Sequence, residues 1–300
     1  MGDLIYSRKA NNSFLTNEEI QQRAPAVFAH GAANHVSDKY GNFDSTTAIA
    51  VMAENNYFPV QAAQIKGQTV KSEMYGQHLL AFAKNDPVSV EDQPEIVFYN
   101  SHDAGSSMRL FAGMYRFICS NGIVAGDGFD QRLVHYQSNV SSFEKMVAST
   151  ADSLEGLSEI TAEMKSKTLS DTAQAEFAEA ALATRFDSYR DFQSVFSMDD
   201  GKRERSVFTS GTVKQALMPR RNGDFNNDAW TVFNRVQEAV LRGGNYFNPL
   251  MVVGDSTRKR FGGKYKIRST KNVRPIKSIR SHVETNRALW DIGQNMLMAA

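Results

Sequence analysis

The sequence predicts an α+β fold, in which helices pack on an antiparallel sheet and a long helical pair occupies the middle of the chain. Three observations support this prediction. Short β-prone runs separated by polar turns are concentrated in the first half of the chain. Longer stretches with apolar residues at helical spacing follow them. An apolar fraction of 41% across 300 residues is enough to form a sizeable core.

The first elements are a helix and a strand. Thr16 and Glu19 form a capping-box pattern that opens a short helix, which we expect to run to about Phe28. A strand and turn are then expected around His35–Phe43.

A second helix and four strands complete the sheet-rich part. Asp44 or Ser45 caps this helix, which is expected to end near Asn55. The strands are expected at residues 57–65, 77–84, 94–100 and 108–119. Because the turn between the last two strands contains Gly and Asp, we expect them to form an antiparallel hairpin.

The turn of this hairpin contains Ser101, His102 and Asp103, the three residue types of a catalytic triad. Adjacent side chains cannot point at one another in the order that proton relay requires, so these residues are not a triad. We expect Asp103 and Ser106 to bond nearby backbone amides, and Gly105 to adopt a positive φ. His102 is a candidate ligand contact.

Two helices are expected in the middle of the chain. From Val140 to about Lys167, apolar residues follow a helical stripe that Gly156 interrupts, at a point where the helix can bend. A second helix is expected over about Thr172–Phe192. Because the connection between them is short, the two helices are expected to form an antiparallel pair.

The helix with the clearest ends follows in the last third. Residues 226–228 offer N-caps, Arg242 lies in the last turn, and Gly243-Gly244 supplies the stop. Basic coil and strand are expected over residues 245–280, before a final helix from about Ser281.

No repeat or linker divides the chain, so we expect a single α+β domain over residues 1–300. Its sub-lobes would be a sheet-rich acidic part (1–135), the helical pair (136–200) and a basic part (201–300). Residues 1–200 hold 15 basic and 26 acidic side chains, a net charge of −11, whereas residues 201–300 hold 19 and 7, a net charge of +12. This asymmetry indicates a local polyanion site. The alternative is that the two parts attract each other on folding.

The most basic stretch is Arg258–Arg280, where ten of 23 residues are Lys or Arg and none is acidic. Within Lys264–Arg268, alternation would place the cations on one face of a strand, suited to a phosphate backbone, while Tyr265 could stack on bases. The candidate nucleic-acid-binding residues are Arg220, Arg221, Arg242, Arg258, Lys259, Arg260, Lys264, Tyr265, Lys266, Arg268, Lys271 and Arg274. Asn234 and Gln237, three apart on one helix, are further candidate ligand contacts. The competing interpretation is a solvated basic face.

Several classes of chemistry have no support in the sequence. The motifs GxxxxGK[ST], CxxC and HExxH are absent, and one cysteine with six scattered histidines gives no metal-ligand spacing. We therefore predict no cofactor and no metal, and we assign no catalytic residue. No run of eighteen apolar residues occurs, so no membrane span is expected. A membrane partner is not expected either, because the basic segment lacks an amphipathic helix with a wide apolar face.

Three stretches carry a resemblance to a known family: Val97–Val124 (VFYNSHDAGSSMRLFAGMYRFICSNGIV), Met218–Gly244 (MPRRNGDFNNDAWTVFNRVQEAVLRGG) and Val273–Leu297 (VRPIKSIRSHVETNRALWDIGQNML). They resemble the phage/plasmid-like proteins of the domain-of-unknown-function 932 family. The resemblance implies a home on mobile elements, often beside genes for DNA metabolism. The single cysteine agrees with a reducing compartment, and the expected location is the host cytoplasm. The resemblance implies no established activity and no catalytic residues.

The leading hypothesis is therefore a non-enzymatic nucleic-acid-binding protein that acts in phage replication or recombination. Its expected partner is single-stranded DNA, which it would bind or anneal, and a homo-oligomer would fit that role. Two alternatives remain open. One is a nuclease or nucleotide-modifying enzyme with dispersed carboxylates, and the other is a protein-interaction module that inhibits or redirects a host factor.

Overall fold

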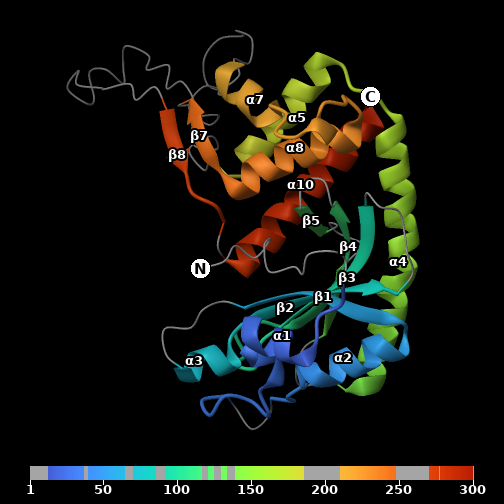
Figure 1. Cartoon of the computed structure of the whole chain (residues 1–300), viewed down its shortest axis with the longest axis vertical. Coiled ribbons are helices and arrows are strands. Elements are labelled where there is room, and N and C mark those ends of the chain that lie inside the picture. Colours follow the sequence, from blue (N-terminus) through green and yellow to red (C-terminus); the bar gives the residue numbers. More distant parts are fainter. Residues whose placement is uncertain are drawn as a thin grey trace, which may run out of the picture. The chain divides into compact units, whose positions relative to one another are not determined.

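The computed structural model confirms the α+β class (Figure 1). It describes residues 13–36, 40–64, 70–85, 92–116, 121–124, 130–133, 139–185, 210–247, 270–276 and 278–299. The chain divides into two compact units: unit 1 is Met1–Glu163 with Lys277–Asp291, and unit 2 is Met164–Ile276 with Ile292–Ala300. The expected sub-lobe boundaries near residues 135 and 200 do not coincide with this division, because helices α4 (Val140–Ser166) and α10 (Ile279–Ala299) each contribute to both units.

Unit 1 is built on a six-stranded sheet whose strand pairs are antiparallel. Its strands are β1 (Tyr57–Gln64), β2 (His78–Lys84), β3 (Asp92–Asn100), β4 (Met108–Arg116), β5 (Asn121–Val124) and β6 (Asp130–Leu133). The order is β1-β2-β3-β4-β5, and β6 also pairs with β4. Strands β3 and β4 form the predicted hairpin, in register from Tyr99↔Arg109 to Asp92↔Arg116.

Both faces of this sheet are buried within unit 1. On one face, Val97 and Phe111 form a core with Val283 of α10. On the other face, Phe98 makes an edge contact with Phe143 of α4, with ring centroids 5.7 Å apart. Because side chains alternate along a strand, neighbouring residues 97 and 98 serve these two separate cores. This explains why residues 96–99 of β3 are apolar without alternation.

The first helix begins as predicted but ends early. In α1 (Asn17–Arg23), the Glu19 carboxylate accepts from the Thr16 amide at 2.9 Å, and the Thr16 hydroxyl accepts from the Glu19 amide at 3.3 Å. The capping box is therefore confirmed. The predicted end at Phe28 is wrong, because Pro25 has no amide hydrogen to continue the helix and starts a separate 3₁₀ turn, η3 (Pro25–Phe28).

The next predicted elements are partly confirmed. Helix α2 (Ser45–Glu54) begins where expected. The strand expected around His35–Phe43 is wrong for the residues of this stretch that are described, which form turns and coil. The polar groups of this stretch form hydrogen bonds that do not belong to a strand ladder. The Val36 amide donates to the Ala33 carbonyl, and the Tyr40 hydroxyl donates to the Ser101 carbonyl at 2.8 Å. Helix α3 (Val70–Tyr75) was not predicted.

The two predicted middle helices are present, but the first is not interrupted at Gly156 and the second ends elsewhere than predicted. Helix α4 runs through Gly156 without interruption, because the i→i−4 bonds of a helix do not need a side chain. Helix α5 (Asp171–Ala183) is capped by Ser170, whose hydroxyl accepts from the Ala173 amide at 3.2 Å. It ends at Ala183, with Thr184 as its C-cap, so the expected end at about Phe192 is wrong.

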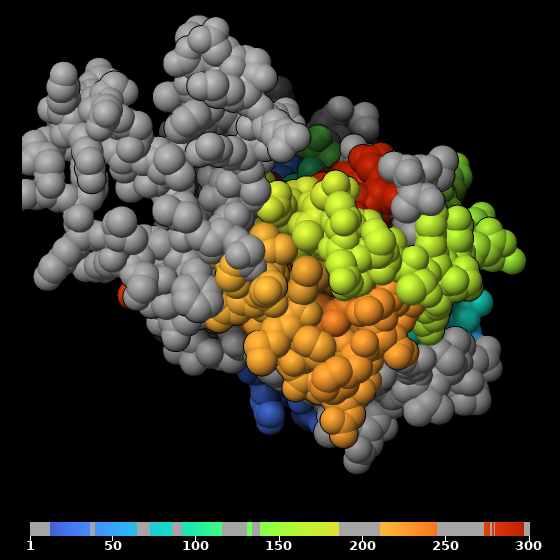
Figure 2. All heavy atoms as spheres, turned by 90° about the horizontal axis from the view of Figure 1, so that it is seen from above, coloured from blue at the N-terminus to red at the C-terminus, as the bar shows by residue number. Residues whose placement is uncertain are grey.

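Unit 2 gathers helices α5, α7 (Ser210–Leu217) and α8 (Ala229–Arg242), which pack on one another (Figure 1). A 3₁₀ turn, η5 (Asn222–Asp224), precedes α8, and a two-stranded antiparallel ribbon of β7 (Gly244–Phe247) and β8 (Thr270–Val273) follows it. Phe233 of α8 stacks on Phe177 of α5, with centroids 5.7 Å apart. In Figure 2 the orange residues of α7 and α8 lie beside yellow-green α5 on one face of unit 2.

Candidate functional site

Helix α8 positions the candidate site, and local interactions fix both of its ends. Asp228 caps its start, because the carboxylate accepts a 2.8 Å hydrogen bond from the Thr231 amide. Gly243 ends it with a φ of 72°. A Cβ atom at this position would lie 2.1 Å from the Val273 carbonyl oxygen of β8, so only glycine lets the ribbon pack there. The predicted cap and stop are both confirmed.

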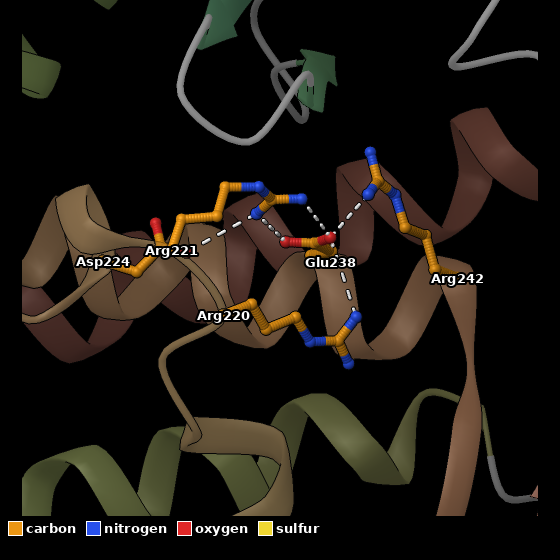
Figure 3. Close-up of polar contacts among 5 residues, drawn as sticks. All are labelled: Arg220, Arg221, Asp224, Glu238 and Arg242. Carbon is orange, nitrogen blue, oxygen red and sulfur yellow. Dashed lines mark hydrogen bonds and ion pairs between the residues drawn. The ribbon is translucent and has the colours of Figure 1, made fainter.

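The centre of the site is the carboxylate of Glu238, whose side chain is 2% exposed. Arg221 binds it as a fork: Nη1 donates to Oε2 at 2.7 Å and Nη2 donates to Oε1 at 2.8 Å. Arg242, one helical turn further along α8, donates from Nη1 to Oε1 at 2.6 Å. Arg220 adds a third ion pair at 3.6 Å (Figure 3). We refer to Arg220, Arg221 and Arg242 around Glu238 as the arginine cluster.

The turn η5 holds Arg221 in place from the other side. The Asp224 amide donates to the Arg221 carbonyl at 3.0 Å, and the Asp224 carboxylate lies 3.5 Å from Arg221 Nη1. Asp224 is itself buried. Arg221 is therefore shared between two buried carboxylates, one on the turn and one on α8, and it joins these elements.

The charges of this group do not balance. Three guanidinium groups face the two carboxylates of Glu238 and Asp224, so five side chains carry a net charge of +1 (3 − 2). Burial raises the pKa of Glu238, but the hydrogen bond from Arg221 and the charges of the three arginines outweigh it and hold this pKa below its ordinary value. Glu238 is thus an ionised anchor that orients cations, and it is not suited to act as a general acid near neutral pH.

Exposure differs among the three arginines and separates their roles. The side chain of Arg220 is 36% exposed and that of Arg221 is 31% exposed, whereas that of Arg242 is 15% exposed. Arg220 also makes the longest ion pair of the three. Its guanidinium therefore has the most donor capacity left for an anion arriving from solvent.

Two large apolar side chains are exposed in the same segment. Met218 is 63% exposed and Phe225 is 66% exposed, and they flank Arg220 and Arg221 in the sequence. Exposed rings next to guanidinium groups are a combination used for binding single-stranded nucleic acid.

The structure thus brings together Arg220, Arg221 and Arg242, three of the residues predicted to bind nucleic acid. Sequence reasoning missed Glu238, the residue that joins them. One signal for it was present, because Glu238 and Arg242 are four residues apart on one helix. The pairing across 17 residues with Arg221 had no comparable local signal.

The two amides predicted as ligand contacts are buried. Asn234 and Gln237 are both 0% exposed. The Asn234 side-chain amide donates to the Trp230 carbonyl at 2.8 Å, within α8. Neither side chain is presented to solvent beside Arg242, and their packing stabilises the position of the helix that carries Glu238.

The remaining candidates fall mainly outside the described part of the chain. Arg258, Lys259, Arg260, Lys264, Tyr265, Lys266 and Arg268 all lie outside the described residues. Lys271 lies in β8, opposite Tyr246. Arg274 follows β8, where it is exposed and its carbonyl accepts a hydrogen bond from Arg185. Arg185 also donates to the Val240 carbonyl and so ties α5 to the C-terminal end of α8.

His102 lies in unit 1, in a polar network that is mostly buried. Its Nδ1 is 3.1 Å from Oδ1 of the Asn42 side chain, and its ring stacks on that of His78 with centroids 5.2 Å apart. The Ser45 hydroxyl lies 2.7 Å from His78 Nε2 and accepts from the Asn100 amide at 3.1 Å. All four of Ser45, His78, Asn100 and His102 are 0% exposed, so this serine–histidine pair is closed to substrate.

The turn beside His102 has the bond predicted for Asp103, with two corrections. The Asp103 carboxylate accepts from the Gly105 amide at 2.8 Å. The bonds of Ser106 differ from the expected ones, because its own amide donates to the Ser101 hydroxyl at 3.0 Å and its hydroxyl lies 3.2 Å from the same oxygen. The positive φ expected at Gly105 occurs instead at Ala104, with φ of 59°. The bond from Asp103 to residue 105 fixes the turn around the intervening Ala104, which takes the strained conformation.

The described residues offer neither a metal site nor a membrane-spanning helix. Among the described residues, no three His, Cys, Asp or Glu side chains converge as metal ligands. None of the helices in that part of the chain combines the length and apolar character needed to cross a membrane.

Fold and site together define an α+β protein whose smaller unit displays an anchored arginine cluster. The chain belongs to the family described as domain of unknown function (DUF932), whose model matches residues 33–290. It is similar to two proteins of Escherichia coli strain K12, UPF0380 protein YfjQ and UPF0380 protein YafZ. Each is 28% identical over 284 residues, which cover 94% of this chain and 92% of the relative. No solved structure matches.

Proposed function

We propose that this protein binds nucleic acid and that the arginine cluster contacts the phosphates. The observation that supports this most directly is the excess of three guanidinium groups over the two buried carboxylates of Glu238 and Asp224, a net charge of +1. Phosphate oxygens accept hydrogen bonds from the fork geometry that arginine offers. Because Glu238 already orients these side chains, they would lose less conformational entropy when a ligand binds.

Within this proposal, Arg220 makes the primary phosphate contact. Arg221 and Arg242 are held by short hydrogen bonds to Glu238, whereas Arg220 lies 3.6 Å from it and is more exposed. Arg221 and Arg242 act as positioning residues that also supply long-range charge.

The basic segment is a second proposed phosphate contact, on sequence grounds alone. Residues 258–268 lie outside the described residues, but the stretch between β7 and β8 starts and ends at the paired residues Phe247 and Thr270. Strand β7 follows α8 directly, so the basic segment comes soon after the arginine cluster in the sequence. Their combined charge would give affinity that falls steeply with salt.

The biological setting is part of the same proposal. A phage or plasmid protein of this kind would act on DNA during replication or recombination in the host cytoplasm, and it would do so as a homo-oligomer if it anneals strands. The alternative of a nuclease draws no support from this site, because the carboxylates of Glu238 and Asp224 are both ion-paired with Arg221.

Binding of a fluorescein-labelled oligothymidylate, followed by anisotropy at low salt, tests the proposal. We compare wild type with Arg220→Ala and with Lys145→Ala, which removes one exposed cation from α4. We expect Arg220→Ala to weaken binding by about tenfold, the loss of one charge-assisted contact, and Lys145→Ala to weaken it by less than about twofold. Equal affinities of the two variants, or no binding by wild type, would refute the proposal.

A further inference from the structure

The segment that links α7 to α8 combines exposed apolar and cationic side chains. Four large hydrophobic residues of the described chain are prominently exposed, and two of them, Met218 and Phe225, belong to this segment. Phe225 is the aromatic one among the four. Leaving a ring 66% exposed costs solvation free energy, because apolar surface is more stable away from water. The ring therefore has binding area available for a ligand.

Backbone geometry keeps Phe225 close to Arg221 of the arginine cluster. Asp224 bonds back to Arg221 through both its amide and its carboxylate. Phe225 follows with φ of −82° and ψ of −16°, which continues the helical turn. Because the Asp224 amide nitrogen lies 3.0 Å from the Arg221 carbonyl oxygen and Phe225 is the next residue, the Phe225 amide nitrogen lies within about 7 Å of that oxygen.

We infer that Phe225 stacks on an unpaired base while the arginine cluster holds an adjacent phosphate, so that the site selects single-stranded over duplex nucleic acid. This inference rests on the proposed function and adds its substrate class. In a duplex the faces of the bases are covered by their stacked neighbours, and an aromatic ring can reach them only in single strands. Phosphates, in contrast, are available in both forms.

Three ligands separate the two contributions: a single-stranded oligothymidylate, the same oligonucleotide annealed to its complement, and inorganic polyphosphate. We expect Phe225→Ala to weaken single-strand binding by about 5- to 100-fold, the loss of one stacked base, and to leave the other two affinities unchanged. Phe225→Leu, which keeps an apolar side chain without a ring, should lose nearly as much. Arg220→Ala should weaken binding of all three ligands.

Fluorescence of Phe225→Trp reports the contact directly. The two natural tryptophans, Trp230 and Trp290, are 1% and 0% exposed, so the new side chain would be the accessible one among the tryptophans. We expect the oligothymidylate to quench its emission and polyphosphate to leave it unchanged. The same oligothymidylate should not quench wild-type emission.

The outcomes distinguish the inference from the proposed function. If Phe225→Ala weakens single-strand and duplex binding equally, or weakens neither, the stacking inference is overturned while phosphate binding by Arg220 stands. If wild type binds none of the three ligands, both fall, and a protein partner becomes the better explanation of the exposed ring.

Discussion

The carboxylate of Glu238 accepts a two-bond fork from Arg221, a residue 17 positions earlier in the chain, at 2.7 and 2.8 Å. This pair joins the segment before α8 to the middle of that helix. Both partners also have a second charged neighbour: Asp224 lies beside Arg221, and Arg242 lies beside Glu238. The fork is thus part of a charged network at the edge of a helix that is otherwise almost entirely buried.

Removal of the Glu238 charge should destabilise the protein. Glu238→Gln would leave three guanidinium groups facing one another without their shared carboxylate, and we expect the free energy of unfolding to fall by about 3 kcal/mol. Urea unfolding followed by circular dichroism measures this. The matched control is Glu284→Gln, which breaks the ion pair with Arg280 between side chains that are 59% and 70% exposed. It should cost less than about 1 kcal/mol, and equal losses would contradict the account.

Ser45 should matter for stability rather than for catalysis. Ser45→Ala would remove the partner of His78 Nε2 and of the Asn100 amide, all of them fully buried. An unsatisfied buried polar group costs about 1–3 kcal/mol, and the free energy of unfolding should fall by that amount. Ser149→Ala, at an exposed position of α4, should change it by less than about 0.5 kcal/mol. An unchanged stability in Ser45→Ala would show that the network is not needed.

Mild acid should destabilise unit 1 through two histidines, the fully buried His78 and the half-buried His282. Burial and the neighbouring His102 lower the pKa of His78 to about 3, and burial lowers the pKa of His282 to about 4, both from 6.5. The folded state therefore holds them neutral, while the unfolded chain takes up protons once the pH falls below about 6.5. Stability should be complete above that pH and be lost progressively as the pH falls, down to about pH 4 for His282 and about pH 3 for His78, by up to about 1.4 kcal/mol per histidine for each pH unit.

Urea midpoints at pH 7 and pH 5 check this dependence. The expected result is a lower midpoint at pH 5 in wild type and a smaller decrease in His282→Gln. His30→Gln, at an exposed position, serves as the control and should behave like wild type. The same midpoint at both pH values in wild type would contradict burial of neutral imidazoles.

Gly243 should tolerate no side chain. Gly243→Ala would place a methyl group 2.1 Å from the Val273 carbonyl oxygen, at a φ of 72°. We expect a loss of more than about 2 kcal/mol in the free energy of unfolding, because strain in the backbone adds to displacement of β8. Gly31 has a similar φ of 75° but open space around it, so Gly31→Ala should lose only about 1 kcal/mol. If both variants lose the same amount, close packing of the ribbon is not the cause.

Local patterns predicted much of the fold. The capping box at Thr16, the strands β1 to β4, and both ends of α8 are encoded by residues within a few positions of one another. The first helix was predicted to run past Pro25 because its apolar pattern continues, whereas the missing amide hydrogen of proline decides where it stops.

The candidate site was less predictable, since its contacts are long-range. The arginines at 220 and 221 were identified as cations without any indication that Glu238 would bind them. The partners of His102 were likewise hidden, because Ser45 and Asn42 precede it by 57 and 60 residues. Amides at Asn234 and Gln237 follow a helical spacing that does not reveal which face is buried, and tertiary packing placed both inside.

The salt dependence of oligothymidylate binding tests the central claim most directly. The slope of log affinity against log salt counts the phosphate contacts, so wild type should have a steep slope and Arg220→Ala a slope shallower by about 0.7–1, with weaker binding throughout. Lys145→Ala should keep the wild-type slope. If Arg220→Ala keeps both the wild-type slope and the wild-type affinity, the arginine cluster does not hold phosphate, and its role is confined to anchoring α8.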